Sequence, residues 1–252
     1  KNNEGVFKDI SEKSGLNTLF GWWFNIQETD INNDGLKDYV VGNIGSNIKF
    51  KTSAEKPLRI YADDFDNNGT HDLVLSYEYE NKYVPLRGKE CSTQQMPFIA
   101  EKIPTFTEFA NSSLQDIYGD KINTSYMREV TDLNSYILIN NGDSTFKRVK
   151  LPDLAQTIPI LSSDVFDYNK DGYEDVIISG NIYNTEVETP RLDNPFALVL
   201  LSNKKNGYQC LSPNATGLYT IGNTKSVRVL NDPKVLIIGN NSESIESFLI
   251  NN

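Results

Sequence analysis

The stretch DINNDGLKD, at residues 30–38, carries the strongest indication of the fold of this chain. It has Asp or Asn at its first, third and fifth positions, Gly at the sixth and Asp at the ninth. Two other stretches share the pattern D-x-[DN]-x-[DN]-G-x-x-D, namely DFDNNGTHD at residues 64–72 and DYNKDGYED at residues 167–175. Three imperfect copies of one nonapeptide indicate a fold built from repeated units.

Each nonapeptide lies between two short runs that are rich in β-branched and aromatic residues. The runs before the loops read WWFNIQET, LRIYAD and PILSSDVF, and those after them begin YVVGNIG, LVLSYEYE and VIISGNIY. Such runs are typical of strands rather than helices. We therefore predict an all-β chain in which each repeat is a strand–loop–strand unit. The first strands of these units are expected near residues 20–29, 57–64, 158–166 and 224–231.

Further strand pairs would complete the units. Residues 135–151 read SYILINNGDSTFKRVKL and residues 196–211 read FALVLLSNKKNGYQCL, each with a turn sequence at its centre. Repeated four-stranded units favour a β-propeller of about four blades. Residues 1–252 would then be a single propeller domain or a fragment of a larger propeller, with the acidic loop of the last blade reduced to NDP at residues 231–233.

Residues 88–121 lack strand alternation and are expected to form a short helical insertion. Ser92 and Thr105 are candidate helix N-caps, and Ser113 followed by Asp116 resembles a capping box. Prolines divide the segment, so we expect two or three short helices rather than one long one.

The spacing of the nonapeptide has a chemical consequence. In a tight loop the side chains at positions 1, 3, 5 and 9 and the carbonyl at position 7 surround one centre, and Gly at position 6 permits the bend. Ca²⁺ takes six to eight oxygen ligands at about 2.3–2.6 Å, and oxygen-only ligation favours it over transition metals. We expect about three Ca²⁺ sites. Their candidate ligands are Asp30, Asn32, Asp34, Leu36 (carbonyl), Asp38; Asp64, Asp66, Asn68, Thr70 (carbonyl), Asp72; and Asp167, Asn169, Asp171, Tyr173 (carbonyl), Asp175.

The loops are not EF-hands, although their first six positions match. An EF-hand needs a bidentate Glu at position 12, whereas Val41, Leu75 and Ile178 stand there. The flanking segments are predicted strands instead of helices. Acidic turns that bind no ion are the remaining alternative.

The three nonapeptides and their flanks resemble the FG-GAP/VCBS repeats of integrin-like β-propellers. The stretches GVFKDISEKSGL and INNGDSTFKRVKLP are similar to hairpins of large bacterial exported VCBS-repeat proteins with ASPIC/UnbV-type segments. The resemblance covers nearly the whole chain and weakens after residue 212. It implies a calcium-binding propeller outside the cytoplasm, often part of a longer surface protein, and it implies no particular reaction.

Composition excludes several classes of protein. The formal net charge is −10, from 24 basic and 34 acidic residues, which disfavours binding to nucleic acid because that depends on Lys and Arg. The sequence contains no run of 18 apolar residues, so we expect no membrane-spanning helix. The opening KNNEGVFKDI lacks a leader pattern, so we expect any signal peptide to lie outside this stretch. His71, the single histidine, lies within an acidic loop, which disfavours His-dependent catalysis. Cys91 and Cys210 are either one disulfide or two thiols.

We therefore expect a non-enzymatic, calcium-stabilised interaction module with no catalytic residues, binding a protein or glycan partner at the cell surface or in the periplasm. One alternative is an architectural subunit of a larger outer-membrane or cell-surface assembly, with an exposed apolar patch around Met96, Phe98 and Phe106. The other is a polysaccharide-active enzyme, which would need a cluster of carboxylates not already assigned to the loops.

Overall fold

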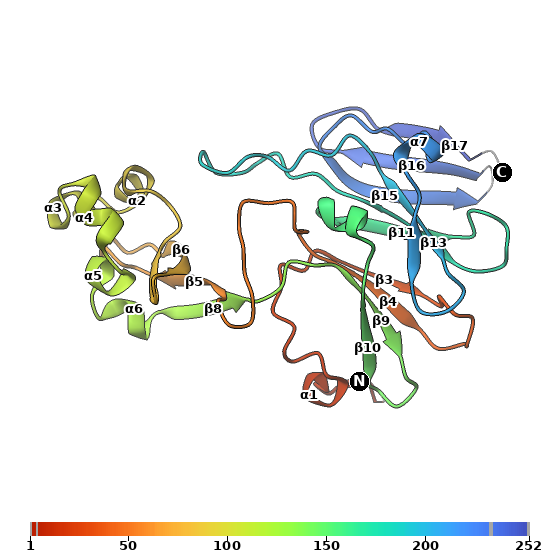
Figure 1. Cartoon of the computed structure of the whole chain (residues 1–252), viewed down its shortest axis with the longest axis horizontal. Helices are drawn as coiled ribbons and strands as arrows, with labels where there is room; N and C mark the ends of the chain where they lie inside the picture. The colour runs from red at the N-terminus through yellow and green to blue at the C-terminus, as the bar shows by residue number, and fades with distance from the viewer. Residues whose placement is uncertain (1, 4, 232–233, 251–252) are drawn as a thin grey trace. The chain divides into compact units, whose positions relative to one another are not determined.

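The structure is a computed structural model that describes residues 2–3, 5–231 and 234–250. It divides into two compact units, of which unit 1 comprises residues 1–50 and 133–252 and unit 2 comprises residues 51–132. Antiparallel sheets dominate unit 1, and unit 2 has one antiparallel sheet beside its helices (Figure 1); the mostly β structure of the chain as a whole confirms the all-β prediction. Among the described residues, none of the helices is both long and apolar enough to cross a bilayer.

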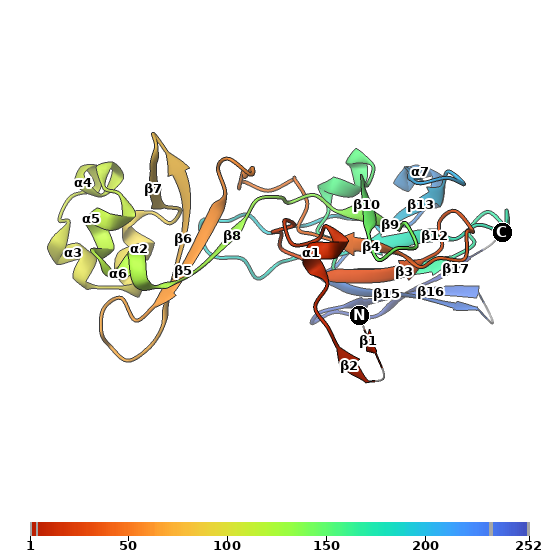
Figure 2. The same cartoon turned by 90° about the horizontal axis from the view of Figure 1, so that it is seen from below.

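Unit 1 contains three main sheets (Figure 2). The first has the order β10-β9-β4-β3, the second β11-β12-β13-β14 and the third β15-β16-β17. The bounds of their strands are β3 Asn25–Thr29, β4 Asp38–Gly42, β9 Tyr136–Asn140, β10 Phe146–Lys150, β11 Ser162–Phe166, β12 Asp175–Ser179, β13 Leu198–Ser202, β14 Tyr208–Cys210, β15 Thr224–Asn231, β16 Lys234–Asn240 and β17 Glu246–Leu249.

Short elements complete unit 1. A two-stranded sheet pairs two residues on each side of a turn near the N-terminus, and three single-turn helices lie in the connections. Their bounds are β1 Asn2–Asn3, β2 Val6–Phe7, α1 Ser11–Ser14, η1 Asp153–Thr157 and α7 Pro213–Thr216.

The three main sheets of unit 1 stack face to face, and strand β12 of the middle sheet is buried on both sides. Ile178 packs with Val40 and Ile137 of the first sheet. Its neighbour Ile177 points to the opposite face, as alternation in a strand requires, and packs with Val227 of the third sheet. The core of unit 1 therefore consists of two apolar layers between three sheets.

The first strands of the three sheets lie side by side, with β11 between β3 and β15. Side chains rather than a backbone ladder join β11 to β15. The backbone N–H of Val229 donates to Asp164 Oδ2 at 2.7 Å, and Arg228 Nη1 donates to the carbonyl of Ser163 at 3.0 Å. The sheets formed by the described residues do not close into a ring.

Unit 2 is one four-stranded sheet covered on one face by five short helices (Figure 1). Its sheet order is β7-β6-β5-β8, and the helices pack on Tyr61 and Val74 of the sheet. The bounds are β5 Leu58–Asp63, β6 Asp72–Tyr79, β7 Lys82–Pro85, α2 Lys89–Gln95, α3 Phe98–Lys102, α4 Phe106–Asn111, α5 Leu114–Tyr118, α6 Lys121–Thr124 and β8 Tyr126–Val130.

Local sequence explains where two of these helices begin. Thr105 and Ser113 are the N-caps of α4 and α5, and both form capping boxes, with Glu108 and Asp116 respectively. The prediction for these two residues is confirmed. The prediction for Ser92 is wrong, because Ser92 lies inside α2 and is buried, and that helix begins after Gly88 without a side-chain cap.

The expected strand positions hold, but the order in which the strands join the sheets differs from simple succession. The hairpins at residues 135–151 and 196–211 are confirmed as β9–β10 and β13–β14. The first of them pairs with β4, so the whole of unit 2 lies in the chain between the second and third strands of one sheet. The inserted segment therefore contains a sheet as well as the helices of residues 89–124. The NDP turn includes residues 232–233, which lie outside the described residues.

Candidate metal-binding loops

The three nonapeptides adopt one backbone conformation, each between the first two strands of its unit. Position 4 is left-handed in all three loops, with φ of 56° at Asn33, 60° at Asn67 and 58° at Lys170. The glycine at position 6 is left-handed as well, with φ between 81° and 90°. Residues other than Gly, Asn and Asp seldom adopt this conformation, which explains the glycine at position 6 and the Asn at position 4 of the first two loops, whereas Lys170 is an exception in the third.

The aspartate at position 1 organises each loop by accepting two backbone N–H groups. One of its oxygens accepts from position 5 and the other from position 6, at distances between 2.9 and 3.1 Å. The acceptors are Asp30, Asp64 and Asp167. The repeated bonding shows that the sequence pattern encodes one loop geometry rather than a general excess of acidic residues.

The aspartate at position 9 is buried and ties its loop to the rest of the unit. Asp38 accepts from the N–H of Ile31 at 3.3 Å and from the N–H of Asn140 on β9 at 2.8 Å. Asp175 likewise accepts from Tyr168 at 2.9 Å and from Ser202 on β13 at 2.8 Å. Burial raises the pKa of both carboxyl groups above its ordinary value, and neighbouring loop carboxylates raise it further.

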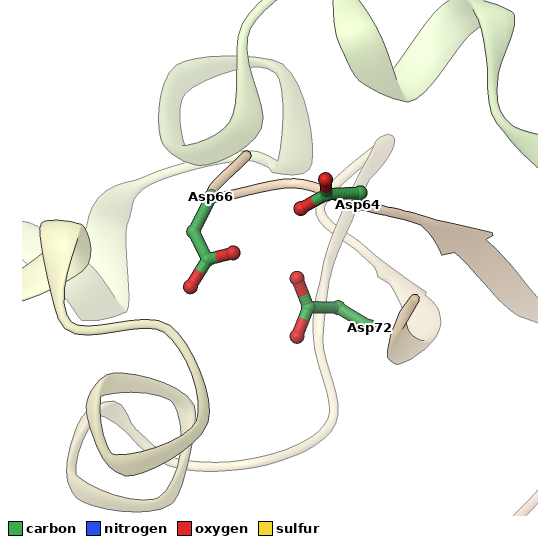
Figure 3. A group of neighbouring side chains, drawn as sticks. All are labelled: Asp64, Asp66 and Asp72. Atoms are coloured by element: carbon green, nitrogen blue, oxygen red, sulfur yellow. The ribbon is translucent and has the colours of Figure 1, made fainter. Parts of the chain in front are cut away.

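In the second loop the position-9 residue is Asp72, which accepts from the N–H of Phe65 at 3.1 Å and from Gln95 Nε2 of α2 at 3.3 Å. Asp64, Asp66 and Asp72 together form a compact group of carboxylates. One oxygen from each lies within 4.8 Å of the others, and Figure 3 shows the three side chains facing a common centre. Three converging carboxylates repel one another unless a cation lies between them, and these three are close enough together to hold a metal ion.

The first and third loops have Asn at position 3 where the second has Asp66. The Nδ2 atoms of Asn32 and Asn169 donate to the position-5 carboxylates Asp34 and Asp171 at 2.9 and 3.0 Å. The Oδ1 atoms of these two Asn residues accept from the backbone N–H of position 5 at 3.2 Å. All proposed side-chain ligands of each loop therefore lie within one hydrogen-bonded turn.

Lysine side chains from other segments contact two of the loops. Lys204, in the turn between β13 and β14, places its Nζ 3.1 Å from Asp171 Oδ2. Burial tends to raise the pKa of Asp171, but the hydrogen bonds from Lys204 and from the N–H of Tyr173 outweigh burial and lower it. Lys121 of α6 donates to Asn67 Oδ1 at 2.8 Å and also to the carbonyl of Asp64. These ammonium groups partly neutralise the loops.

Glu174, which the nonapeptide pattern does not mark as a functional residue, joins the first and third loops. Its Oε2 accepts the backbone N–H of Asp30 at 2.7 Å and the hydroxyl of Thr29 at 3.0 Å. In the other direction, Asn33 Nδ2 donates to the carbonyl of Gly172 at 3.0 Å. The only available signal was an acidic residue at position 8 of the third loop, where the other two loops have Lys37 and His71.

The two cysteines belong to different elements. Cys91 lies in α2 of unit 2 and Cys210 in β14 of unit 1, and the described residues contain no disulfide. Burial raises the pKa of the Cys210 thiol to about 11. Cys210 is therefore a protonated thiol packed beside the core of unit 1.

No protein-family profile matches this chain, and no curated protein sequence is significantly similar to it.

Proposed function

We propose that this chain is a calcium-stabilised propeller module of the FG-GAP/VCBS kind that acts by binding a partner and has no catalytic activity. The observation that carries the proposal is the common geometry of the three nonapeptide loops, each set between the first two strands of a sheet. Calcium is the expected ion because the ligands are carboxylate, amide and carbonyl oxygens.

The role of calcium in this proposal is structural. Each loop supplies three carboxylates, and an ion at the centre would offset their repulsion while fixing the turn between two strands. The position-9 aspartates would carry this effect into the neighbouring elements, because Asp38 and Asp175 hydrogen-bond to the third strands of their sheets. Affinities of extracellular calcium modules are about 10⁻⁴–10⁻³ M, so a cell-surface or periplasmic location suits the proposal.

The propeller part of the proposal rests on the stacking of unit 1. Its three sheets place their first strands side by side, and the two outermost faces of the stack expose apolar side chains. Ile26 of the first sheet is 66% exposed and Leu249 of the third is 65% exposed. Further blades packed on these faces would bury both residues and complete the ring.

The proposed partner is a protein or a glycan at the cell surface. An architectural role in a larger assembly predicts an apolar patch on the helices around Met96, Phe98 and Phe106, and this prediction is wrong for two of the three residues. Met96 is buried and Phe98 packs against the core of unit 2, so only Phe106, which is 69% exposed, faces solvent. Met96 and Phe98 of the helical segment therefore pack with the sheet residues Tyr61 and Val74 instead of forming an exposed patch.

Thermal unfolding of the full chain with and without calcium tests the metal part of the proposal. A ligand that binds only the native state stabilises it by mass action, by about 2.7 kcal/mol at one hundred times its Kd. We expect the Tm to rise with millimolar Ca²⁺ and to fall again with chelator, and Mg²⁺ to have a smaller effect. An unchanged Tm would contradict calcium binding.

A pair of variants makes the same test specific to the loops. Asp66→Asn should weaken the calcium-dependent rise in Tm, because Asp66 belongs to the carboxylate group of the second loop. Asp153→Asn removes the same charge from a side chain that is 99% exposed and lies outside the loops. The control variant should keep the full calcium effect.

A further inference from the structure

A pocket in unit 2 lies between the sheet and helices α5 and α6. Its volume is about 380 Å³, within the usual range of about 300–1,000 Å³ for small-molecule sites. The sheet contributes Arg59 and Tyr61 from β5, Tyr83 from β7 and Met127 from β8. None of these residues belongs to the nonapeptide loops, so the pocket is a feature separate from the proposed metal sites.

One donor of the Arg59 guanidinium, its Nε, has no hydrogen-bond partner among the described residues. The guanidinium lies over the ring of Tyr83, 4.1 Å from the ring centroid. Its Nε is buried without a hydrogen-bond partner, and the nearest carboxylate oxygen, Glu129 Oε2, is 3.6 Å away. A buried donor in this state is unfavourable unless something accepts from it. Stacking on Tyr83 holds the guanidinium in place at the wall of the pocket, where its other N–H groups can donate to a ligand.

The helical wall of the pocket adds neutral polar groups that are held in place. Asn123 Nδ2 donates to Gln115 Oε1 at 2.9 Å, and Gln115 Nε2 donates to Asp120 Oδ1 at 2.8 Å. Ser125 donates its hydroxyl to the carbonyl of Ile122 at 2.9 Å. Amide and hydroxyl groups can both donate and accept, so this wall suits a ligand that does the same.

The charges around the pocket balance and do not favour an anion. Arg59 is paired with Glu129, and Glu78 on the same face of the sheet is paired with Lys56 at 3.4 Å. A carboxylate or phosphate that approached Arg59 would meet Glu129 as well. The remaining lining is apolar and includes Leu114 and Met127. A neutral ligand with several hydroxyl groups and an apolar face matches this combination.

We propose that this pocket binds a neutral hexopyranose unit, with Arg59 donating to ring or hydroxyl oxygens, the amide of Asn123 accepting from a hydroxyl, and the apolar lining packing against the C–H face of the sugar. This inference rests on the proposed function in that it takes the chain to be a binding module, and it selects a glycan over a protein as the partner. It does not require any nonapeptide loop to hold an ion.

Titration of the full chain with D-glucose, D-galactose, D-mannose and N-acetyl-D-glucosamine, followed by NMR chemical shifts in calcium-containing buffer, tests the proposal. At least one sugar should bind and shift the signals of Arg59, Asn123 and Met127. If none of the four sugars binds, the proposal is overturned. Tighter binding of D-glucuronate than of D-glucose would also overturn it, because the site would then be an anion site.

Two variants locate the binding. Arg59→Gln should lower the affinity for the sugar about tenfold or more, because a charge-assisted donor is lost. Arg128→Gln is a matched control, since Arg128 also lies 4.1 Å from a tyrosine ring centroid, that of Tyr126, but on the opposite face of the same sheet. Equal losses in the two variants would contradict the assignment to this pocket.

A third variant and a separate readout keep the outcomes distinct. If Arg59→Gln unfolds, Asn123→Ala at the helical wall should still fold, because Asn123 lies in an exposed part of α6. It should also lower the affinity for the sugar, because Asn123 lines the pocket. Unchanged sugar affinity in that variant would count against the proposal. Calcium-dependent Tm, measured without sugar, reports on the proposed function alone. Failure of sugar binding with an intact calcium effect therefore overturns only this inference.

Discussion

Glu174 of the third loop accepts the backbone N–H of Asp30 in the first loop at 2.7 Å. Asp30 in turn accepts the N–H groups of Asp34 and Gly35, so a carboxylate from one sheet supports the residue that organises the turn of another. The two loops of unit 1 are thus parts of one hydrogen-bonded assembly. A conformational change in either loop should therefore affect the other through these hydrogen bonds.

Replacing Glu174 should therefore destabilise the protein more than replacing an ordinary surface carboxylate. Glu174→Ala leaves the N–H of Asp30 and the hydroxyl of Thr29 without their acceptor, and we expect a loss of about 1–2 kcal/mol in the free energy of unfolding. Urea denaturation in metal-free buffer measures it. Glu28→Ala is the control, since its pair with Lys37 is exposed on both sides and should contribute less than about 1 kcal/mol. Equal losses would contradict a special role for Glu174.

The glycine at position 6 should be needed because its backbone adopts a left-handed conformation, and not because a side chain would have no room there. Gly172 has φ of 83°, and a Cβ added there would meet no atom within 4 Å. Gly172→Ala should thus cost about 1–2 kcal/mol from backbone strain alone. Chemical denaturation measures the loss. Gly207→Ala is the comparison and should cost less, because Gly207 lies in a turn where φ is not positive. Its new Cβ would meet only the end of the Asn203 side chain, at 3.1 Å.

Sequence spacing was sufficient to predict the loops and the strands that flank them, because both are local properties. The left-handed residues at positions 4 and 6 and the hydrogen bonds of position 1 all lie within six residues of each other. The hairpins at residues 135–151 and 196–211 were predictable for the same reason. The spacing was sufficient to name the candidate ligands. Among them, the carboxylates of Asp64, Asp66 and Asp72 converge most clearly on one centre.

Long-range pairing was not predictable from spacing. Nothing local in β4 indicates that Val40 lies opposite Ile137, with the 82 residues of unit 2 inserted in the chain between them. The contacts of Glu174 and Lys204 with loop residues are likewise set by how the sheets stack. Ser92 shows the converse problem, because a residue type that favours the N-cap lies buried inside α2 and donates its hydroxyl to the carbonyl of Arg87.

Lys204 should compete with calcium at the third loop. Its ammonium group lies 3.1 Å from Asp171 Oδ2, an oxygen that the proposed site would use. Lys204→Met removes this competitor, and we expect the calcium affinity of the third loop to rise about two- to fivefold, as suits an exposed ion pair. Calcium titration followed by NMR signals of residues 167–175 measures the change. Lys205→Met, an exposed neighbour in the same turn, should leave the affinity unaltered, and an equal gain there would point to net charge instead.

The titration of the buried aspartates Asp38 and Asp175 should change when calcium binds. Burial raises the pKa of both carboxyl groups in the folded protein. Above the unfolded-state pKa the folded state then binds more protons than the unfolded state, so the contribution of these groups to stability falls as pH rises through their folded-state pKa. A bound cation favours the charged carboxylate and should lower both pKa values. Carboxyl ¹³C NMR titrations in metal-free and calcium-saturated buffer measure them directly. If calcium left both pKa values where they are in metal-free buffer, Asp38 and Asp175 would not be ligands of the ion.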